Sequence, residues 1–169
     1  TIGENIQIRR FEKFNGPTVG YVHAGGKIGV LVNIETDVAD TAKVEELGKD
    51  IAMQIAAANP SYLNKEEVPA EVLEKEKEIL TQQAINEGKP AAIAEKMVAG
   101  RIAKYYKENC LVEQAFVKDD KQSITAYTNA TAKELGGDIK IVAFTRFEKG
   151  EGIEKKVDDF AAEVAAMSK

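Results

Sequence analysis

The hydrophobic pattern of the first forty residues predicts an antiparallel sheet. Apolar and other residues alternate over 19–23 and again over 28–34, as in strands whose alternate side chains share one face. Gly25 and Gly26 lie between these runs and tolerate the positive φ angles of a tight turn, so the two runs form a hairpin. An earlier alternation over 4–14 predicts a preceding strand, and the three strands form an antiparallel meander.

The period then changes from two residues to that of an α-helix. The apolar positions of this stretch are Val44, Leu47, Ile51 and Ile55. Their spacing predicts an amphipathic helix that covers one face of the sheet. Asp37 or Asp40 is suited to cap its start, and Asn59-Pro60 ends it.

Two charged helices with narrow apolar stripes follow, joined by a turn at 86–90. The first stripe recurs by sevens, with Val72, Ile79, Leu73 and Leu80; the second contains Ala94, Met97, Val98, Arg101, Ile102 and Tyr105. This pattern predicts an antiparallel helical hairpin, a short coiled coil. At 1.5 Å per residue it extends about 27 Å, and a narrow stripe favours an arm that projects from the sheet. The alternative is that both helices lie flat on the core.

The last third of the chain predicts two helices and a strand. Ser123 can cap a short helix closed by Gly136-Gly137, and residues 139–147 form a strand rich in β-branched and aromatic side chains. The run 150–152 breaks that strand. A final helix begins near Glu154, with Val157, Phe160, Ala161 and Val164 in one stripe. It can dock on its own domain or on a partner.

These elements predict an α+β protein with a projecting helical hairpin and a C-terminal helix. We expect a core α+β subdomain over 1–65 and 109–150, a helical-hairpin domain over 66–108 and a C-terminal module over 151–169. The chain begins at Thr1, without methionine, and enters a strand pattern almost at once. We therefore expect a longer polypeptide to extend ahead of it.

Composition narrows the classes of function. The net charge is −5, with 23 basic and 28 acidic residues mixed along the chain, so no basic block indicates a nucleic-acid partner. No run approaches the roughly 20 apolar residues that span a bilayer, and we expect no membrane partner. Cys110 is the single cysteine, which excludes an intrachain disulfide and a cysteine-based metal site. A reducing cytoplasm is the expected compartment.

Candidate catalytic chemistry is sparse. The Gly-rich run 24–27 has strands on both sides, whereas a phosphate loop precedes a helix. His23 is the only imidazole and no serine forms a recognisable motif with it. A pair between Cys110 and His23 stays open as a minor alternative. We expect that the protein is not an enzyme and that it binds no cofactor and no metal. His23 is either a structural residue at the turn or a residue that contacts a partner.

Several segments, in order along the chain, resemble bacterial elongation factor Ts. They include Ile2-Gly3-Glu4-Asn5-Ile6 and Tyr21-x-His23-x-Gly25-x-Lys27-Ile28-Gly29-Val30, then 50–54, 88–101, 114–117, 146–155 and 159–167. These matches extend over nearly the whole chain, so the resemblance is more specific than any single motif. It implies a translation elongation factor that promotes GDP release from elongation factor Tu.

The resemblance also implies which residues make contacts. Tyr21, His23, Gly25 and Lys27 match the hairpin that contacts the third domain of Tu. The arm matches the family's dimerisation domain, with Val72, Ile79, Met97 and Ile102 as its candidate contacts and a homodimer as a possible assembly. The last helix, with Val157, Phe160, Val164 and Met167, matches the module on the nucleotide-binding domain of Tu. The expected partner states are GDP-bound and nucleotide-free Tu.

One departure from the family bears on activity. The family carries an upstream helical domain and a Thr-Asp-Phe-Val motif whose aromatic ring intrudes near the magnesium site of Tu. No residue here matches it, because Thr36-Asp37-Val38 lacks the phenylalanine and follows a different hairpin. We expect weak exchange from this chain. The alternative function is a stand-alone interaction or oligomerisation module without exchange activity.

Overall fold

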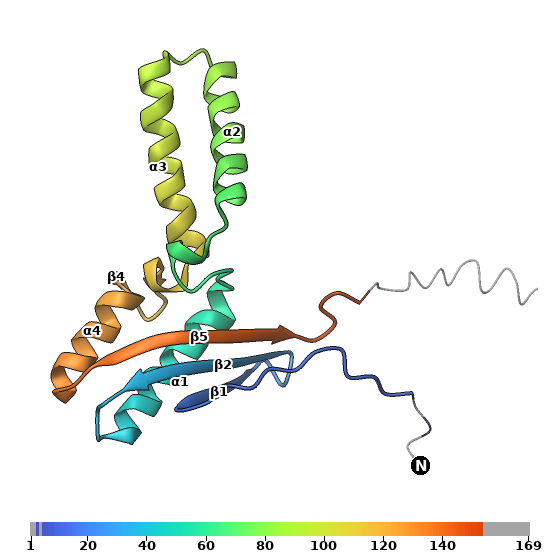
Figure 1. Cartoon of the computed structure of the whole chain (residues 1–169), viewed down its shortest axis with the longest axis vertical. Coiled ribbons are helices and arrows are strands. Elements are labelled where there is room, and N and C mark those ends of the chain that lie inside the picture. The colour runs from blue at the N-terminus through green and yellow to red at the C-terminus, as the bar shows by residue number, and fades with distance from the viewer. Residues whose placement is uncertain (1–2, 4, 154–169) are drawn as a thin grey trace, which may run out of the picture.

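The chain adopts the predicted α+β fold. The structure is a computed structural model that describes residues 3 and 5–153 (Figure 1). The described elements, in order, are β1 Thr18–His23, β2 Ile28–Thr36, α1 Thr41–Ala58, the 3-10 turn η1 Lys65–Glu67, α2 Ala70–Asn86, α3 Ala91–Asn109, the 3-10 turn η2 Leu111–Glu113, β3 Ala115–Phe116, β4 Asp119–Ser123, α4 Ile124–Leu135 and β5 Ile139–Glu148. The predicted helix from about Glu154 lies outside the described residues.

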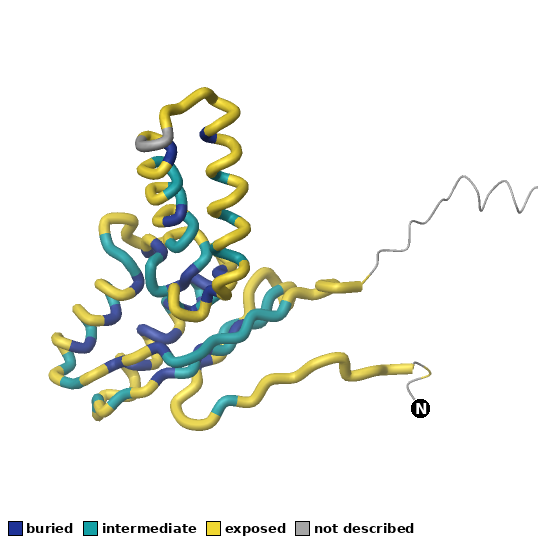
Figure 2. Tube along the Cα trace, turned by 45° about the horizontal axis from the view of Figure 1, so that its top comes forward, coloured by how far each residue is buried: buried dark blue, intermediate teal, exposed yellow. Residues whose placement is uncertain are grey.

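The main sheet is antiparallel, with strand order β1-β2-β5. The β1–β2 hairpin is confirmed, but the predicted strand over 4–14 is wrong, since residues 5–15 contain no strand. Ile6 and Ile8 are 67% and 84% exposed, and Figure 2 shows this run exposed along almost its whole length. A strand needs a hydrogen-bonding neighbour and a face to bury, and these isoleucines meet no core layer. The third strand is β5 instead, from far along the chain.

The core lies between α1 and one face of the sheet. Val32, Ile34, Leu47, Ile51 and Ile55 are at most 1% exposed. Asp40 caps α1 by accepting a hydrogen bond from the Lys43 amide, and Asn59 ends the helix at φ 46°. The helix period and both end signals are therefore confirmed, with Asp40 rather than Asp37 as the cap.

A second, two-stranded sheet was not predicted from the sequence. β3 and β4 form it, and the charged run 119–121 lacks the apolar alternation that marks a half-buried strand. Phe116 of β3 stacks on Tyr127 of α4 with ring centroids 4.4 Å apart. As predicted, Ser123 caps α4 and Gly136, at φ 71°, ends it.

The helical hairpin projects from the sheet as predicted. Figure 1 shows α2 and α3 side by side and standing away from the sheet, so the flat alternative is wrong. The amides of Ser61 and Tyr62 donate to the Asn109 carbonyl, at 2.9 and 3.1 Å, and anchor the base of α3 beside the end of α1. The coiled-coil description and the division into three domains stay predictions.

The seam between α2 and α3 differs from the predicted heptads at one position. Ala84, Ala94 and Ile102 are buried, and Leu73 and Leu80 are partly buried. Ile79 is 43% exposed, so its placement in the seam is wrong. Neighbouring residues of an α-helix are 100° apart, and a face through Leu80 and Ala84 leaves Ile79 outside it.

Candidate interaction surface

The turn between β1 and β2 places the single histidine at the exposed end of a hairpin. The His23 carbonyl accepts hydrogen bonds from the amides of Gly26 and Lys27, at 3.2 and 3.1 Å. Gly25 and Gly26 have φ angles of 65° and 90°, the left-handed region that glycine adopts without strain. The predicted use of both glycines is confirmed, and the turn fixes where His23 and Lys27 emerge.

Tyr21 holds the His23 ring in place. The two residues are two positions apart on β1 and share one face. The Tyr21 hydroxyl lies 2.9 Å from His23 Nδ1, and the ring centroids are 5.8 Å apart. His23 is exposed and Tyr21 is half-buried. When neutral His23 accepts this bond at Nδ1, it carries its proton on Nε2, which is then a donor for a partner.

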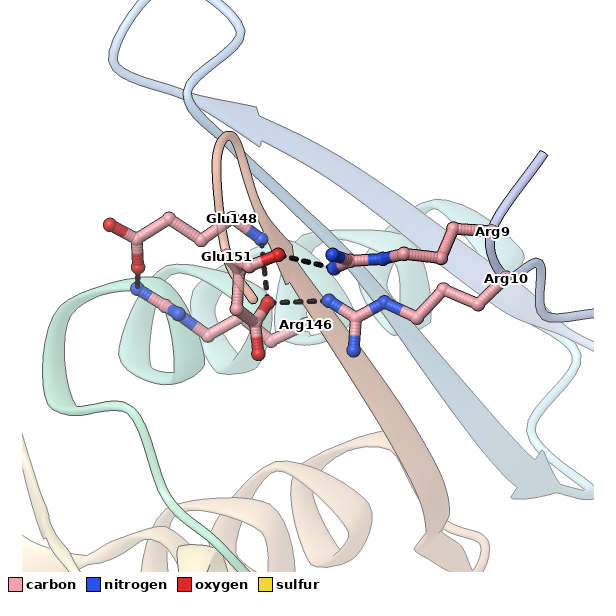
Figure 3. Close-up of polar contacts among 5 residues, drawn as sticks. All are labelled: Arg9, Arg10, Arg146, Glu148 and Glu151. Atoms are coloured by element: carbon pink, nitrogen blue, oxygen red, sulfur yellow. Dashed lines mark hydrogen bonds and ion pairs between the residues drawn. The ribbon is translucent and has the colours of Figure 1, made fainter. Parts of the chain in front are cut away.

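β5 extends this surface across the sheet. Tyr21, Val30 and Arg146 stand in one cross-strand row, and His23, Ile28 and Glu148 stand in the next. Arg146 donates a 2.8 Å hydrogen bond to the Glu148 carboxylate (Figure 3). The resulting hairpin-tip surface consists of Tyr21, His23, Ile28, Arg146 and Glu148. Arg146 and Glu148 were not predicted as part of it, because their placement depends on a strand pairing more than 110 residues away.

The opposite face of the hairpin is also open near the tip. An apolar hollow there is lined by Gly20, Val22, Gly29, Leu31 and Phe147, among others. Val22 is 71% exposed. Gly20 and Gly29 contribute no side chains to this part of the sheet. The hairpin therefore presents aromatic and charged groups on one face and an open apolar surface on the other.

The arm carries a second apolar surface. A groove on α2 and α3 is lined by Lys77, Thr81, Ile85, Ala94, Glu95, Val98, Ala99 and Ile102. Ile79, Ile85 and Ile93 are 43%, 56% and 49% exposed. Of the predicted arm contacts, Ile102 lies in the seam and lines the groove, Val72 and Met97 are half-buried, and Ile79 is exposed.

The described residues offer little for bond-making chemistry. Residues 3 and 5–153 contain no group of three or more His, Cys, Asp or Glu side chains arranged to hold a metal ion. Cys110 is fully buried at the arm base, and burial raises the pKa of its thiol above the usual range. Within that part of the chain no hydrogen bond joins Cys110 to His23. No described helix is both long and apolar enough to cross a membrane.

Four of the predicted contacts follow β5 in the sequence. Val157, Phe160, Val164 and Met167 lie outside the described residues. Their assignment as contacts stays a prediction, as do those of Tyr21, His23, Gly25 and Lys27 at the hairpin.

Comparison with known proteins identifies the family. The family model described as "Elongation factor TS" matches residues 1–151. Elongation factor Ts of Clostridium botulinum strain Alaska E43 (type E3) is 57% identical over 167 residues, which cover 97% of this chain and 55% of the relative. Elongation factor Ts of strain ATCC 19397 (type A) is 55% identical over 166 residues, covering 96% and 54%. The chain thus spans about half the length of the curated relatives it matches. The chain belongs to the elongation factor Ts family.

Proposed function

We propose that this chain binds elongation factor Tu in the cytoplasm and contributes to the release of GDP from it. The observation that carries the proposal is the exposed Tyr21–His23 pair on the β1–β2 hairpin of a chain in the elongation factor Ts family. The relatives are about twice as long, so full exchange activity is proposed for the longer protein and Tu binding for this chain.

Nucleotide exchange requires no acid, base or nucleophile on the exchange factor. A factor that binds nucleotide-free Tu more tightly than GDP-bound Tu lowers the affinity of Tu for GDP by the same ratio, because the two binding equilibria are linked. The requirement is a preorganised protein-binding surface. The hairpin tip is suited to this role, since its turn and the Tyr21–His23 bond restrict the contact groups before any partner arrives.

The hairpin-tip surface has the chemistry of an interaction hot spot. Tyrosine and arginine are enriched among the interface residues whose truncation to alanine costs the most binding energy. The hairpin-tip surface contains one of each, Tyr21 and Arg146. Arg146 has only 14% of its side chain exposed, so its position is fixed before binding. Lys27 adds a positive charge at the tip.

Local geometry supports weak exchange by this chain alone. Thr36 donates a 2.7 Å hydrogen bond to the Asp138 carbonyl, and Asp37 accepts one of 2.6 Å from the Asp138 amide. Both side chains are therefore engaged in joining the end of β2 to the start of β5. Together with the missing phenylalanine, this argues against a nucleotide-displacing role for Thr36-Asp37-Val38.

Release of a fluorescent GDP analogue from Tu tests the proposal. We expect this chain to bind Tu, measured by titration, while accelerating release far less than a full-length elongation factor Ts in the same assay. Failure to bind Tu overturns the proposed function. Release as fast as with the full-length factor would contradict the view that residues outside this chain are needed.

The groove on the arm favours a second function, self-association. Ile85 lines this apolar groove and is 56% exposed, and such an exposed apolar surface is unusual without a partner. Light scattering over a concentration series should give a dimer mass for the chain and a monomer mass for Ile85→Asp. The matched control is Gln82→Asp, an exposed position on the same helix. A monomer at all concentrations would remove this candidate.

A further inference from the structure

The turn ahead of β1 contains the one place in this sequence where asparagine precedes glycine, Asn15-Gly16. Both residues are exposed, and Gly16 has a φ of 82°. Within residues 3 and 5–153 the Gly16 amide donates no hydrogen bond, so its nitrogen is not engaged in a strand or a helix. Glycine also lacks the Cβ atom that would shield this nitrogen. The nitrogen therefore has open access to the neighbouring Asn15 side chain.

These features permit a reaction within the chain itself. The Gly16 nitrogen attacks the side-chain carbonyl carbon of Asn15, and a carbon–nitrogen bond forms. The side-chain nitrogen leaves as ammonia, taking the proton of the Gly16 amide, and a five-membered succinimide ring remains. Water then opens the ring at either carbonyl and gives aspartate or isoaspartate. No electrons are transferred, the only co-reactant is water, and the product carries an additional negative charge.

The remaining asparagines lack one or another of these features. Asn5 is exposed and lies outside any helix or strand, as Asn15 does, but the branched side chain of Ile6 crowds the nitrogen that follows it. The nitrogen after Asn59 belongs to Pro60 and carries no hydrogen. The others lie within or at the start of a regular element: Asn33, Asn64, Asn86, Asn109 and Asn129.

The Asn33 side chain restrains the turn that contains Asn15. Asn33 Nδ2 lies 2.9 Å from the Asn15 carbonyl oxygen and 3.0 Å from that of Pro17. The Pro17 carbonyl also accepts a 2.9 Å hydrogen bond from the Ile34 amide, which fixes the end of the turn to β2. The main-chain carbonyl of Asn15 becomes part of the succinimide ring. Ring closure therefore changes the direction of this carbonyl and competes with its hydrogen bond from Asn33.

We propose that Asn15-Gly16 is a self-modification site, at which the chain converts an amide into an aspartyl or isoaspartyl carboxylate as it ages, and that Asn33 slows this conversion. The reaction places a new negative charge immediately before β1, and isoaspartate also lengthens the main chain there. It needs no partner, so the proposal stands independently of Tu binding. Asn33 is a positioning residue, since it holds the Asn15 main chain and takes no part in the chemistry.

Peptide mapping by mass spectrometry tests the site. The folded parent chain is incubated in a mildly alkaline buffer, and isoaspartate is measured by methyl transfer from S-adenosylmethionine with an isoaspartyl methyltransferase. Asn15 should convert at least about tenfold faster than Asn5, the matched control in the same run. Conversion of Asn5 at the same rate, or faster conversion of any other asparagine, would overturn the proposal.

Asn33→Asp tests the restraint. It keeps the shape of the side chain but loses the Nδ2 donor, so conversion of Asn15 should accelerate about fivefold, the effect of releasing one ordinary hydrogen bond. The matched control is Asn129→Asp, which makes the same charge change at an exposed position of α4 and should leave the rate unchanged. Circular dichroism checks that both variants fold. An unchanged rate in folded Asn33→Asp would overturn the role of Asn33.

The parent chain in urea gives a second measurement, which does not depend on the folding of a variant. Unfolding releases the Asn15 carbonyl from Asn33, so conversion should be faster in urea than in the folded chain. A rate in urea no faster than that of the folded chain would overturn the restraint, whatever the behaviour of Asn33→Asp.

Discussion

The side-chain amides of Gln54 and Gln114 are hydrogen-bonded to each other at 3.0 Å, and both residues are buried. The side-chain oxygen of Gln54 also accepts a hydrogen bond from the Val117 amide at 2.8 Å, and the Gln114 side chain donates one to the Glu108 backbone carbonyl at 2.8 Å. Glu108 belongs to α3. These bonds connect the middle of α1 to the base of the arm, so the core helix and the projecting hairpin share one buried polar network.

Replacing Gln54 should therefore destabilise the fold. Gln54→Leu keeps a similar volume but leaves the Val117 amide and the Gln114 oxygen without partners, which costs about 1–3 kcal/mol. Urea unfolding followed by circular dichroism measures the change. Gln82→Leu, on the exposed face of α2, is the control and should change stability by less than about 0.5 kcal/mol. Equal stability of the two variants would contradict the network's role.

Two glycines in helices are expected to respond to alanine with opposite signs. A Cβ on Gly48 of α1 would lie 2.5 Å from Val19 Cγ2, so Gly48→Ala should cost about 1–3 kcal/mol through overpacking. A Cβ on Gly100 of α3 meets nothing within 4 Å, and Gly100→Ala should stabilise by about 0.5–1 kcal/mol. Thermal unfolding of both variants measures the difference. A stabilising Gly48→Ala would show that α1 does not approach β1 this closely.

Cys110 should be chemically inert in the folded chain. It is fully buried, and burial raises the pKa of the thiol, so little thiolate is available near neutral pH. We expect a thiol reagent such as Ellman's reagent to react only as fast as the protein opens. In denaturant the reaction should be immediate. Rapid reaction of the folded chain would contradict the burial of this side chain.

The same pKa shift gives a direction for stability against pH. In the unfolded chain the pKa of the thiol is about 8.5, whereas in the folded chain its pKa is raised and the thiol stays protonated to higher pH. Below that value both states are protonated and the stability is unaffected. As the pH rises beyond it, the unfolded state gains charge more readily and the unfolding free energy falls. Cys110→Ala should show a shallower decline above pH 8.5, as measured by urea unfolding at several pH values.

Local signals in the sequence predicted much of this fold. The periods of α1 and of the β1–β2 hairpin, and the caps at Ser123 and Gly136, each depend on residues close in the chain, so neighbouring residues suffice to predict them. The arm was predicted as a pair of antiparallel helices. The position of Ile79, however, depends on the rotation of α2 about its axis relative to α3, which a short heptad run does not determine.

The failures involve partners that are distant in the chain. Ile6 and Ile8 alternate like a strand, but nothing local shows that β5 occupies the remaining place beside β2. For the same reason Arg146 and Glu148 were not predicted at the hairpin tip, although His23 and Tyr21 were predicted there. The contacts of Arg9 and Arg10 with Glu151 join positions near opposite ends of the described chain, and no spacing rule links them.

The most direct test of the account is titration of nucleotide-free Tu into the chain and into His23→Ala. His23→Ala removes an exposed ring whose only described hydrogen bond is to Tyr21, so the fold should persist, as checked by circular dichroism. Tu binding should weaken by about 1–2 kcal/mol, while the exposed control Lys133→Ala on α4 should bind like the parent chain. Unchanged affinity for His23→Ala would contradict the assignment of the hairpin tip as the contact with Tu.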